Sequence, residues 1–138
     1  MNRVRELAAR TGRSLDQERR KRLGQYFTGT GLGRVLAALA QAEKASSILD
    51  PMAGSGDLLA SCMEIGAKPL ALAGMEIDPD ARDTCALRLP GANCVLGSAF
   101  DSTTISRLPQ RTWDLVVGNP PYVRYQSFSD KADPSHAL

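Results

Sequence analysis

Residues 47–59 read Ser47-Ile48-Leu49-Asp50-Pro51-Met52-Ala53-Gly54-Ser55-Gly56-Asp57-Leu58-Leu59. A short apolar run ends in an acid, a loop with two glycines follows, and a helical pattern begins at once. This order predicts a strand, a tight turn that faces a ligand, and a helix, the first unit of a doubly wound α/β sheet. The glycines permit unusual backbone angles and let a ligand approach the main chain. A strand-to-helix turn without a ligand is the alternative interpretation.

The loop matches a dinucleotide-binding fingerprint only in part, because Leu59 stands where the third glycine of G-x-G-x-x-G belongs. No Gly-Lys-Ser/Thr follows to make a P-loop. Asp50 and Asp57 flank the loop, and carboxylates repel a pyrophosphate. An acidic, glycine-lined pocket suits a ligand with hydroxyl groups and positive charge. S-adenosylmethionine, which carries a sulfonium and an ammonium, is such a ligand.

Length and composition indicate one modest globular domain of 138 residues, with 43% apolar and 23% charged residues. No apolar run is long enough for a membrane span, and no signal-peptide pattern opens the chain. Cys62, Cys85 and Cys94 are an odd number without C-x-x-C spacing, which predicts reduced, packed thiols in a cytoplasmic protein. The single histidine, His136, has no evident partner, so we expect no metal site.

The positive charge gathers at the start of the chain. Residues 1–24 carry eight Arg/Lys and three acids, a local balance of +5, which leaves −3 for the remainder of a chain whose net charge is +2. Ser14 and Gln17 form a capping-box pattern before a basic helical run that stops at Gly24. This basic segment fits a phosphate-backbone partner such as DNA, or alternatively a solvated helix face.

Strand and helix patterns alternate along the centre of the chain. The strands are uniformly apolar, which predicts a parallel sheet buried on both faces. We expect Thr30 to cap the first helix and Asp78 to cap the third. The expected helices cover residues 32–44, 58–65 and 79–87, and the expected strands cover residues 47–50, 70–77, 93–97 and 113–118.

Two further strand ends carry candidate ligand contacts. Glu76 closes the second strand, and an acid about twenty residues after the glycine loop typically takes ribose hydroxyls, in NAD as in S-adenosylmethionine. Capping of the next helix is the alternative for Glu76. After the third strand, Ser98 could bond an adenine amino group and Phe100 could lie against its ring. A strand-end turn with a core aromatic explains these two residues equally well.

Asn119-Pro120-Pro121-Tyr122 follows the fourth strand and is the strongest chemical signal. The prolines stiffen the loop and lack an N–H, so the loop presents two acceptors: the Asn119 side-chain carbonyl and the Pro120 backbone carbonyl. Two fixed acceptors can hold both hydrogens of an –NH₂ group and favour a pyramidal nitrogen, whose lone pair is then free to attack an electrophilic methyl. Tyr122 offers a face on which a planar target can stack. A rigid turn that only ends the strand is the alternative.

These motifs together resemble the N-terminal part of a DNA adenine-N6 methyltransferase of the bacterial restriction-modification type. Gly24-Gln25-Tyr26-Phe27-Thr28, the stretch from Asp50 to Gly56, Glu76-Ile77-Asp78 and Asn119-Pro120-Pro121-Tyr122 resemble four of its motifs, within residues 21–124. The resemblance implies a Rossmann-like class I methyltransferase core (its N-terminal half), S-adenosylmethionine as cofactor, DNA as partner and no metal. It implies Asn119, Pro120, Pro121 and Tyr122 as catalytic residues. It implies as cofactor-binding residues Tyr26, Phe27, Thr28, Asp50, Met52, Ala53, Gly54, Gly56, Glu76, Ile77, Ser98, Ala99 and Phe100.

Two departures from that family pattern stand out. The family usually has an acid near Ser98, so Ser98 or the displaced Asp101 must hold the cofactor's adenine. The family fold has seven strands, and this chain runs out after the fourth.

We therefore expect a basic helical segment with a cofactor-covering loop (1–45), a partial methyltransferase domain (46–124) and a polar tail (125–138). We expect this chain to be inactive alone and to need a missing half. Two alternatives remain: a protein-glutamine methyltransferase, whose target amide presents the same –NH₂ group, and a non-catalytic cofactor-binding remnant.

Overall fold

The computed structural model describes residues 29–120, and the structural statements below concern these residues. Their elements are α2 (Thr30–Leu39), the 3-10 helix η1 (Ala42–Lys44), β1 (Ser47–Asp50), α3 (Asp57–Glu64), β2 (Ala71–Glu76), α4 (Pro79–Arg88), β3 (Asn93–Leu96), α5 (Ser102–Ile105) and β4 (Leu115–Val116). The predicted basic segment with its capping box, the Gln25–Thr28 motif, Pro121, Tyr122 and the polar tail lie outside the described residues. The predicted three-part division of the chain therefore stays a prediction.

The strands form one parallel sheet in the order β3-β2-β1-β4, which confirms the predicted α/β class. β1 pairs with β2 from Ser47↔Ala71 to Asp50↔Gly74, and with β4 through Ile48↔Leu115 and Leu49↔Val116. The chain moves outward from β1 to β3 and then returns to the other side of β1. The direction of winding thus reverses between β1 and β4, and such a reversal is where doubly wound sheets bind ligands.

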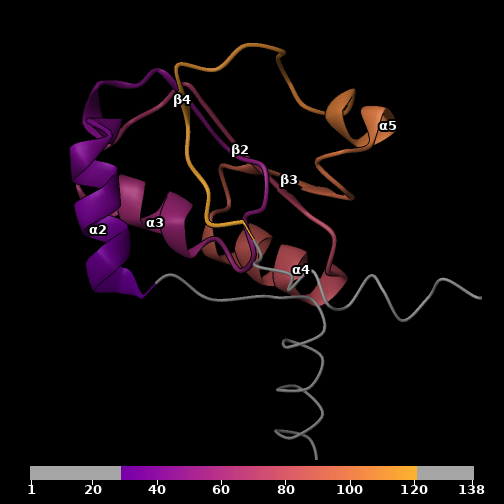
Figure 1. The fold of residues 1–138 in the computed structure, drawn as a ribbon, viewed down its shortest axis with the longest axis horizontal. Helices are drawn as coiled ribbons and strands as arrows, with labels where there is room; N and C mark the ends of the chain where they lie inside the picture. The colour runs from indigo at the N-terminus through magenta and orange to yellow at the C-terminus, as the bar shows by residue number, and fades with distance from the viewer. Residues whose placement is uncertain (1–28, 121–138) are drawn as a thin grey trace, which may run out of the picture. The chain divides into compact units, whose positions relative to one another are not determined.

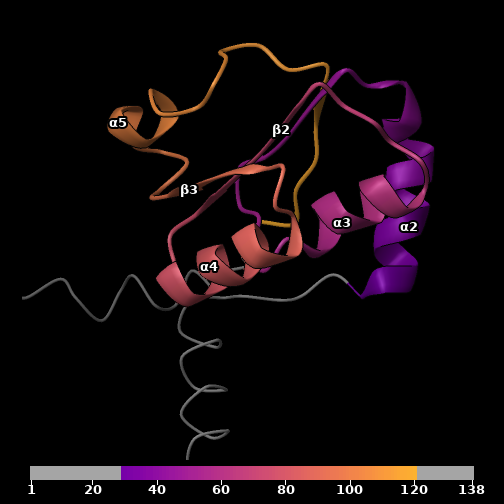
Figure 2. The same cartoon turned by 180° about the vertical axis from the view of Figure 1, so that it is seen from behind.

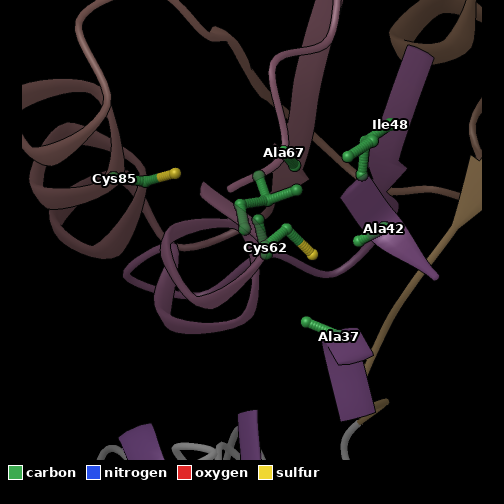
Figure 3. Close-up of a cluster of buried hydrophobic side chains, with 8 residues drawn as sticks. Ala37, Ala42, Ile48, Cys62, Ala67 and Cys85 are labelled. Carbon is green, nitrogen blue, oxygen red and sulfur yellow. The ribbon is translucent and has the colours of Figure 1, made fainter. Parts of the chain in front are cut away.

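Helices cover the sheet on two sides. Figures 1 and 2 show α2, α3 and α4 in a row along one side and α5 on the other. Figure 3 shows part of the larger core cluster, which lies on the side of α2, α3 and α4 and includes Ile48, Leu59 and Cys85. A second cluster on the opposite face joins Leu49, Ala73, Met75 and Val95. Because Ile48 and Leu49 are neighbours in β1, they point to opposite faces, as strand geometry requires.

The predicted long helix over residues 32–44 is wrong in its second half. Gln41 takes a left-handed conformation, with φ 52° and ψ 42°, and separates α2 from η1. Thr30 is the first residue of α2 and not its cap, because Gly29 holds the cap position without a side-chain hydrogen bond. The apolar residues Leu32, Val35, Leu36 and Leu39 are exposed, whereas Gly33 and Ala37 are buried.

The strands also depart from the predicted pattern of burial. All four residues of β1 are buried, but Asn93 of β3 is exposed and Val116 of β4 is 56% exposed. β4 is shorter than the predicted 113–118: the N–H of Asp114 donates at 2.9 Å to the side-chain Oγ of Ser47 in β1 and not to a backbone carbonyl of that strand. Among the described residues, β4 pairs with β1 alone and forms one edge of the sheet.

The predicted cap of α4 is confirmed. The Asp78 carboxylate accepts from the backbone N–H groups of Asp80 and Ala81, and Pro79 occupies the first helical position, where its missing N–H costs nothing. Within residues 29–120, no helix has the length and apolar character needed to cross a membrane.

Candidate functional site

The loops after β1 and β4 lie side by side at the point where the winding reverses. The N–H of Val117 donates to the carbonyl of Leu49 at 2.9 Å, so the two strand ends run in register. A Cβ built on Gly118 would lie 3.5 Å from Asp50 Oδ1 and 3.7 Å from Pro51 Cδ. The structure therefore places Asp50, the last residue of β1, beside Gly118, the residue directly before the predicted site residue Asn119. Asn119 is half-buried and Pro120 is exposed.

The glycine loop is fixed to the sheet by its own backbone. The N–H of Ala53 donates to the carbonyl of Met75 at 2.9 Å, and the N–H of Gly56 donates to the carbonyl of Ala53 at 2.8 Å. Gly54 and Gly56 have φ angles of +54° and +83°, a region that favours glycine. A Cβ at Gly54 would meet no atom of residues 29–120 within 4 Å, so within this part of the chain open space for a ligand adjoins the glycine.

Gly74 lets the loop rest directly on β2. A Cβ at this position would lie 2.8 Å from the Ala53 Cβ and 3.3 Å from the Leu59 Cδ1, too close for any larger residue. Sequence reasoning did not single out Gly74 as a support of the site. A glycine inside an otherwise apolar strand is the signal that could have found it, since it often marks a close approach of another backbone.

Glu76 connects the loop to the end of β2. Its Oε2 accepts from the N–H of Gly54 and its Oε1 accepts from the N–H of Asp78, both at 2.8 Å. The side chain is 7% exposed. The alternative role of helix cap is wrong, because Asp78 caps α4. Each carboxylate oxygen has a second lone pair, so Glu76 can still accept hydroxyl donors from a ligand.

Asp50 is a buried acid without a counter-charge among residues 29–120. It is 2% exposed, and within the described residues neither Asp50 nor Glu76 forms an ion pair. Burial raises the pKa of Asp50 from 3.8 to about 7; the hydrogen bond from the Met52 N–H lowers it, and the nearby Glu76 carboxylate raises it further. A cation placed beside Asp50 would relieve both the desolvation and the repulsion.

Asp57, the other acid of the loop, is neutralised. Its carboxylate pairs with the Arg88 guanidinium from the last turn of α4, and it also accepts from the Ser55 hydroxyl at 3.3 Å. The expectation that Asp57 adds free negative charge beside the glycine loop therefore fails, and Asp50 and Glu76 are the acids there without an ion pair among the described residues. Sequence reasoning missed Arg88, because 31 residues separate it from Asp57.

The turn after β3 contains the residues that were predicted to contact the adenine of the cofactor, and these residues have different surroundings. Ser98 Oγ accepts from the Phe100 N–H at 3.2 Å, Phe100 is 87% exposed, and Ala99 packs against the second core cluster. The interpretation of Phe100 as a core aromatic is therefore wrong. Asp101 caps α5 and accepts from Thr103 and Thr104, contacts that lower its pKa, chiefly through the Thr103 hydroxyl. Since Asp101 is engaged by α5, Ser98 is the freer of the two candidates.

These observations fit a cationic ligand with hydroxyl groups better than a phosphate ligand. The ends of β1 and β2 present two buried acids, and no described atom fills the space beside Gly54 in the loop after β1. Met52 is half-buried in the same loop, and Ile77, directly after Glu76, is 61% exposed and able to meet an apolar part of the ligand. A pyrophosphate would add negative charge beside Asp50 and Glu76, which is unfavourable.

Comparison with known proteins places these features in a family. Type II methyltransferase M.HincII of Haemophilus influenzae is 31% identical over 116 residues, which are 84% of this chain and 20% of that protein. Type II methyltransferase M.TthHB8I of Thermus thermophilus is 33% identical over 100 residues, which are 72% of this chain and 21% of that protein. The chain thus spans about a fifth of the length of these relatives.

A solved structure supports the fold independently. An O-methyltransferase from Bacillus cereus, in complex with SAH, superposes with a TM-score of 0.58 over 77% of this chain and 51% of that chain, at 16% identity. This likeness confirms the class I methyltransferase architecture predicted from the sequence. The N-6 DNA Methylase family model matches residues 13–136, which is most of the chain. The chain therefore belongs to the N-6 DNA methylase family.

Proposed function

We propose that the protein containing this chain transfers a methyl group from S-adenosylmethionine to the N6 amino group of adenine in DNA. The observation that carries the proposal is the juxtaposition of Asp50 and its glycine loop with Gly118, directly before Asn119-Pro120, in a chain of the N-6 DNA methylase family. The glycine loop after Asp50 suits a cationic cofactor, and the loop that contains Asn119 and Pro120 suits an amine. Because the chain spans about a fifth of its relatives, the activity belongs to the complete protein.

Asp50 and Glu76 would hold the two polar parts of the cofactor. Ionised Asp50 favours the positively charged methionine end, and the Glu76 carboxylate accepts from the ribose hydroxyls while it keeps the Gly54 N–H in place. Ile77, Ser98 and Phe100 are the candidates for the adenine. The bound cofactor supplies an electrophilic methyl group.

Asn119 and Pro120 would act on the acceptor. Their carbonyl oxygens accept the two hydrogens of the adenine amine, which keeps these hydrogens out of the ring plane and the nitrogen lone pair directed at the methyl group. No basic side chain is needed before transfer, because the proton is lost from a nitrogen that has already become cationic. By the family resemblance, Tyr122 would stack on an adenine turned out of the duplex.

A protein-glutamine acceptor presents the same –NH₂ geometry, but the match to a DNA methylase family disfavours it. DNA as partner, a further polypeptide region that reads its sequence, and a cytoplasmic location complete the proposal. The free thiols of Cys62, Cys85 and Cys94 are consistent with a reducing compartment.

The test is Asn119→Ala in the complete protein, assayed with tritiated cofactor on DNA. We expect methyl transfer to fall at least about 100-fold, as when one polar group at a reacting centre is removed, while the cofactor Kd changes only a few-fold. Asn93→Ala, at an exposed asparagine that starts β3, is the matched control. Near-normal turnover of Asn119→Ala would contradict the proposed role, and label recovered in protein glutamine would favour the alternative.

A further inference from the structure

Two of the three cysteines face each other directly behind the glycine loop. Cys94 Sγ of β3 donates to Cys85 Sγ of α4 across 3.4 Å. Cys85 is 1% exposed, whereas Cys94 is partly exposed on a strand that forms one edge of the described sheet. A disulfide bond is about 2.05 Å long, so the two sulfurs would have to approach by about 1.4 Å to be joined.

Cys85 also touches the loop itself. A Cβ at Gly56 would lie 2.8 Å from Cys85 Sγ, which means that the sulfur occupies the space beside this glycine. Figure 3 shows Cys85 pointing from α4 into the cluster that includes Cys62 of α3. Gly56 precedes the first residue of α3 and caps this helix, so the sulfur supports the loop where the loop becomes a helix.

We propose that Cys85 and Cys94 are an oxidation site, at which a peroxide converts the two thiols into a disulfide that weakens ligand binding at the adjacent glycine loop. The effect on the ligand rests on the proposed function, whereas disulfide formation does not. The two cysteines have different roles. Burial, together with the contact from Cys94, raises the pKa of Cys85 to about 12, so Cys85 stays protonated and the more accessible Cys94 reacts first.

One molecule of hydrogen peroxide oxidises the two thiols of Cys85 and Cys94 to one disulfide. The Cys94 sulfur attacks one oxygen of hydrogen peroxide, the O–O bond breaks, and a sulfenic acid and one water result. The Cys85 sulfur then attacks the Cys94 sulfur: the S–S bond forms, the S–O bond breaks, and the departing hydroxide takes the proton of Cys85 as a second water. The thiols lose two electrons in total, and these electrons reduce the O–O bond.

Closure of the disulfide draws the two sulfurs about 1.4 Å closer, and the part of this movement made by Cys85 Sγ takes the sulfur away from Gly56. Packing forces decline steeply over gaps of about 1 Å. Gly56 has φ +83° and donates its N–H to Ala53, so a shift there is transmitted to the backbone beside Gly54. The reduced protein is therefore the form that binds the ligand well.

The first experiment treats the purified chain with hydrogen peroxide and counts free thiols under denaturing conditions. We expect three thiols before treatment and only that of Cys62 afterwards, with a mass loss of about 2 Da for two hydrogens and full reversal by dithiothreitol. Cys94→Ser should form no disulfide, and the control Cys62→Ala should form it normally. Oxygen adducts on Cys94 or disulfides between chains, in place of the internal bond, would overturn the proposal.

The second experiment compares the Kd of S-adenosylmethionine for the reduced and oxidised forms of the complete protein. We expect oxidation to weaken binding at least about threefold through the lost contact at Gly56, and Cys94→Ser to remove this sensitivity. Equal affinity of the two forms would refute the coupling to the loop. Absence of binding to the reduced protein would instead refute the proposed function, and the thiol count would still decide whether the oxidation site exists.

Discussion

Replacement of Asp50 by asparagine should stabilise the fold at neutral and alkaline pH. The pKa of Asp50 is raised from 3.8 to about 7, chiefly by burial. Since the pKa in the folded state lies above that of the unfolded chain, the stabilisation from protonated Asp50 is complete below pH 3.8 and is lost as the pH rises through about 7. Above that pH the loss amounts to about 4 kcal/mol, at about 1.4 kcal/mol for each pKa unit.

Asparagine avoids this loss because it cannot ionise. Its Oδ1 can still accept from the Met52 N–H, the contact that Asp50 makes at 2.9 Å. Its uncharged amide would not be repelled by the Glu76 carboxylate. Urea denaturation of Asp50→Asn and the unmodified chain should therefore give equal free energies of unfolding near pH 4 and a difference approaching about 4 kcal/mol at pH 8. A variant that is no more stable at pH 8 would refute the assignment of Asp50 as a buried acid with unbalanced charge.

Further substitutions test the loop and its surroundings. Asp101→Asn should destabilise the chain at pH 7 and have little effect at low pH, because its lowered pKa gives stabilisation that is lost as the pH falls; denaturation at pH 3 and 7 checks this. Gly56→Ala should cost about 2–4 kcal/mol of unfolding free energy, since it adds a contact with Cys85 Sγ to the left-handed backbone strain. Gly54→Ala, whose added Cβ meets no atom of the described chain within 4 Å, should cost only the strain of about 1–2 kcal/mol, and equal costs at the two glycines would contradict this difference.

The sequence patterns predict the central units of the fold well because their signals are local. β1, β2 and α4 lie within a residue or two of the predicted positions, and the Asp78 cap is correct. The alternation of strand and helix also predicts the parallel sheet, since each helix returns the chain to the same edge. The adjacency of the β1 and β4 loops follows from this winding, and that is why the candidate site could be anticipated.

The sequence-based predictions fail where contacts between residues far apart in the chain determine the structure. Nothing in the alanine-rich end of α2 predicts that Gln41 turns left-handed, a conformation uncommon for residues other than glycine and asparagine. The pairing of Asp57 with Arg88 and the bond from Gly54 to Glu76 join residues far apart in the chain, so no local pattern contains them. The short helix α5 was missed because it is only four residues long, although Asp101 before Ser102 is a usable cap signal.

The two acids at the site differ in how far folding alone explains them. Glu76 has a structural use, because its two oxygens hold the N–H groups of Gly54 and Asp78 and thereby fix the loop to the end of β2. Asp50 accepts one backbone N–H, from Met52, which asparagine would satisfy equally well without a charge. Its ionised form is unfavourable, because Asp50 is buried and lies near Glu76. A cation bound beside Asp50, as in the proposed function, would offset this cost. At Asp50, fold stability and the binding of a cationic ligand thus favour different side chains. Asp50→Asn should therefore raise the free energy of unfolding and weaken the binding of that ligand.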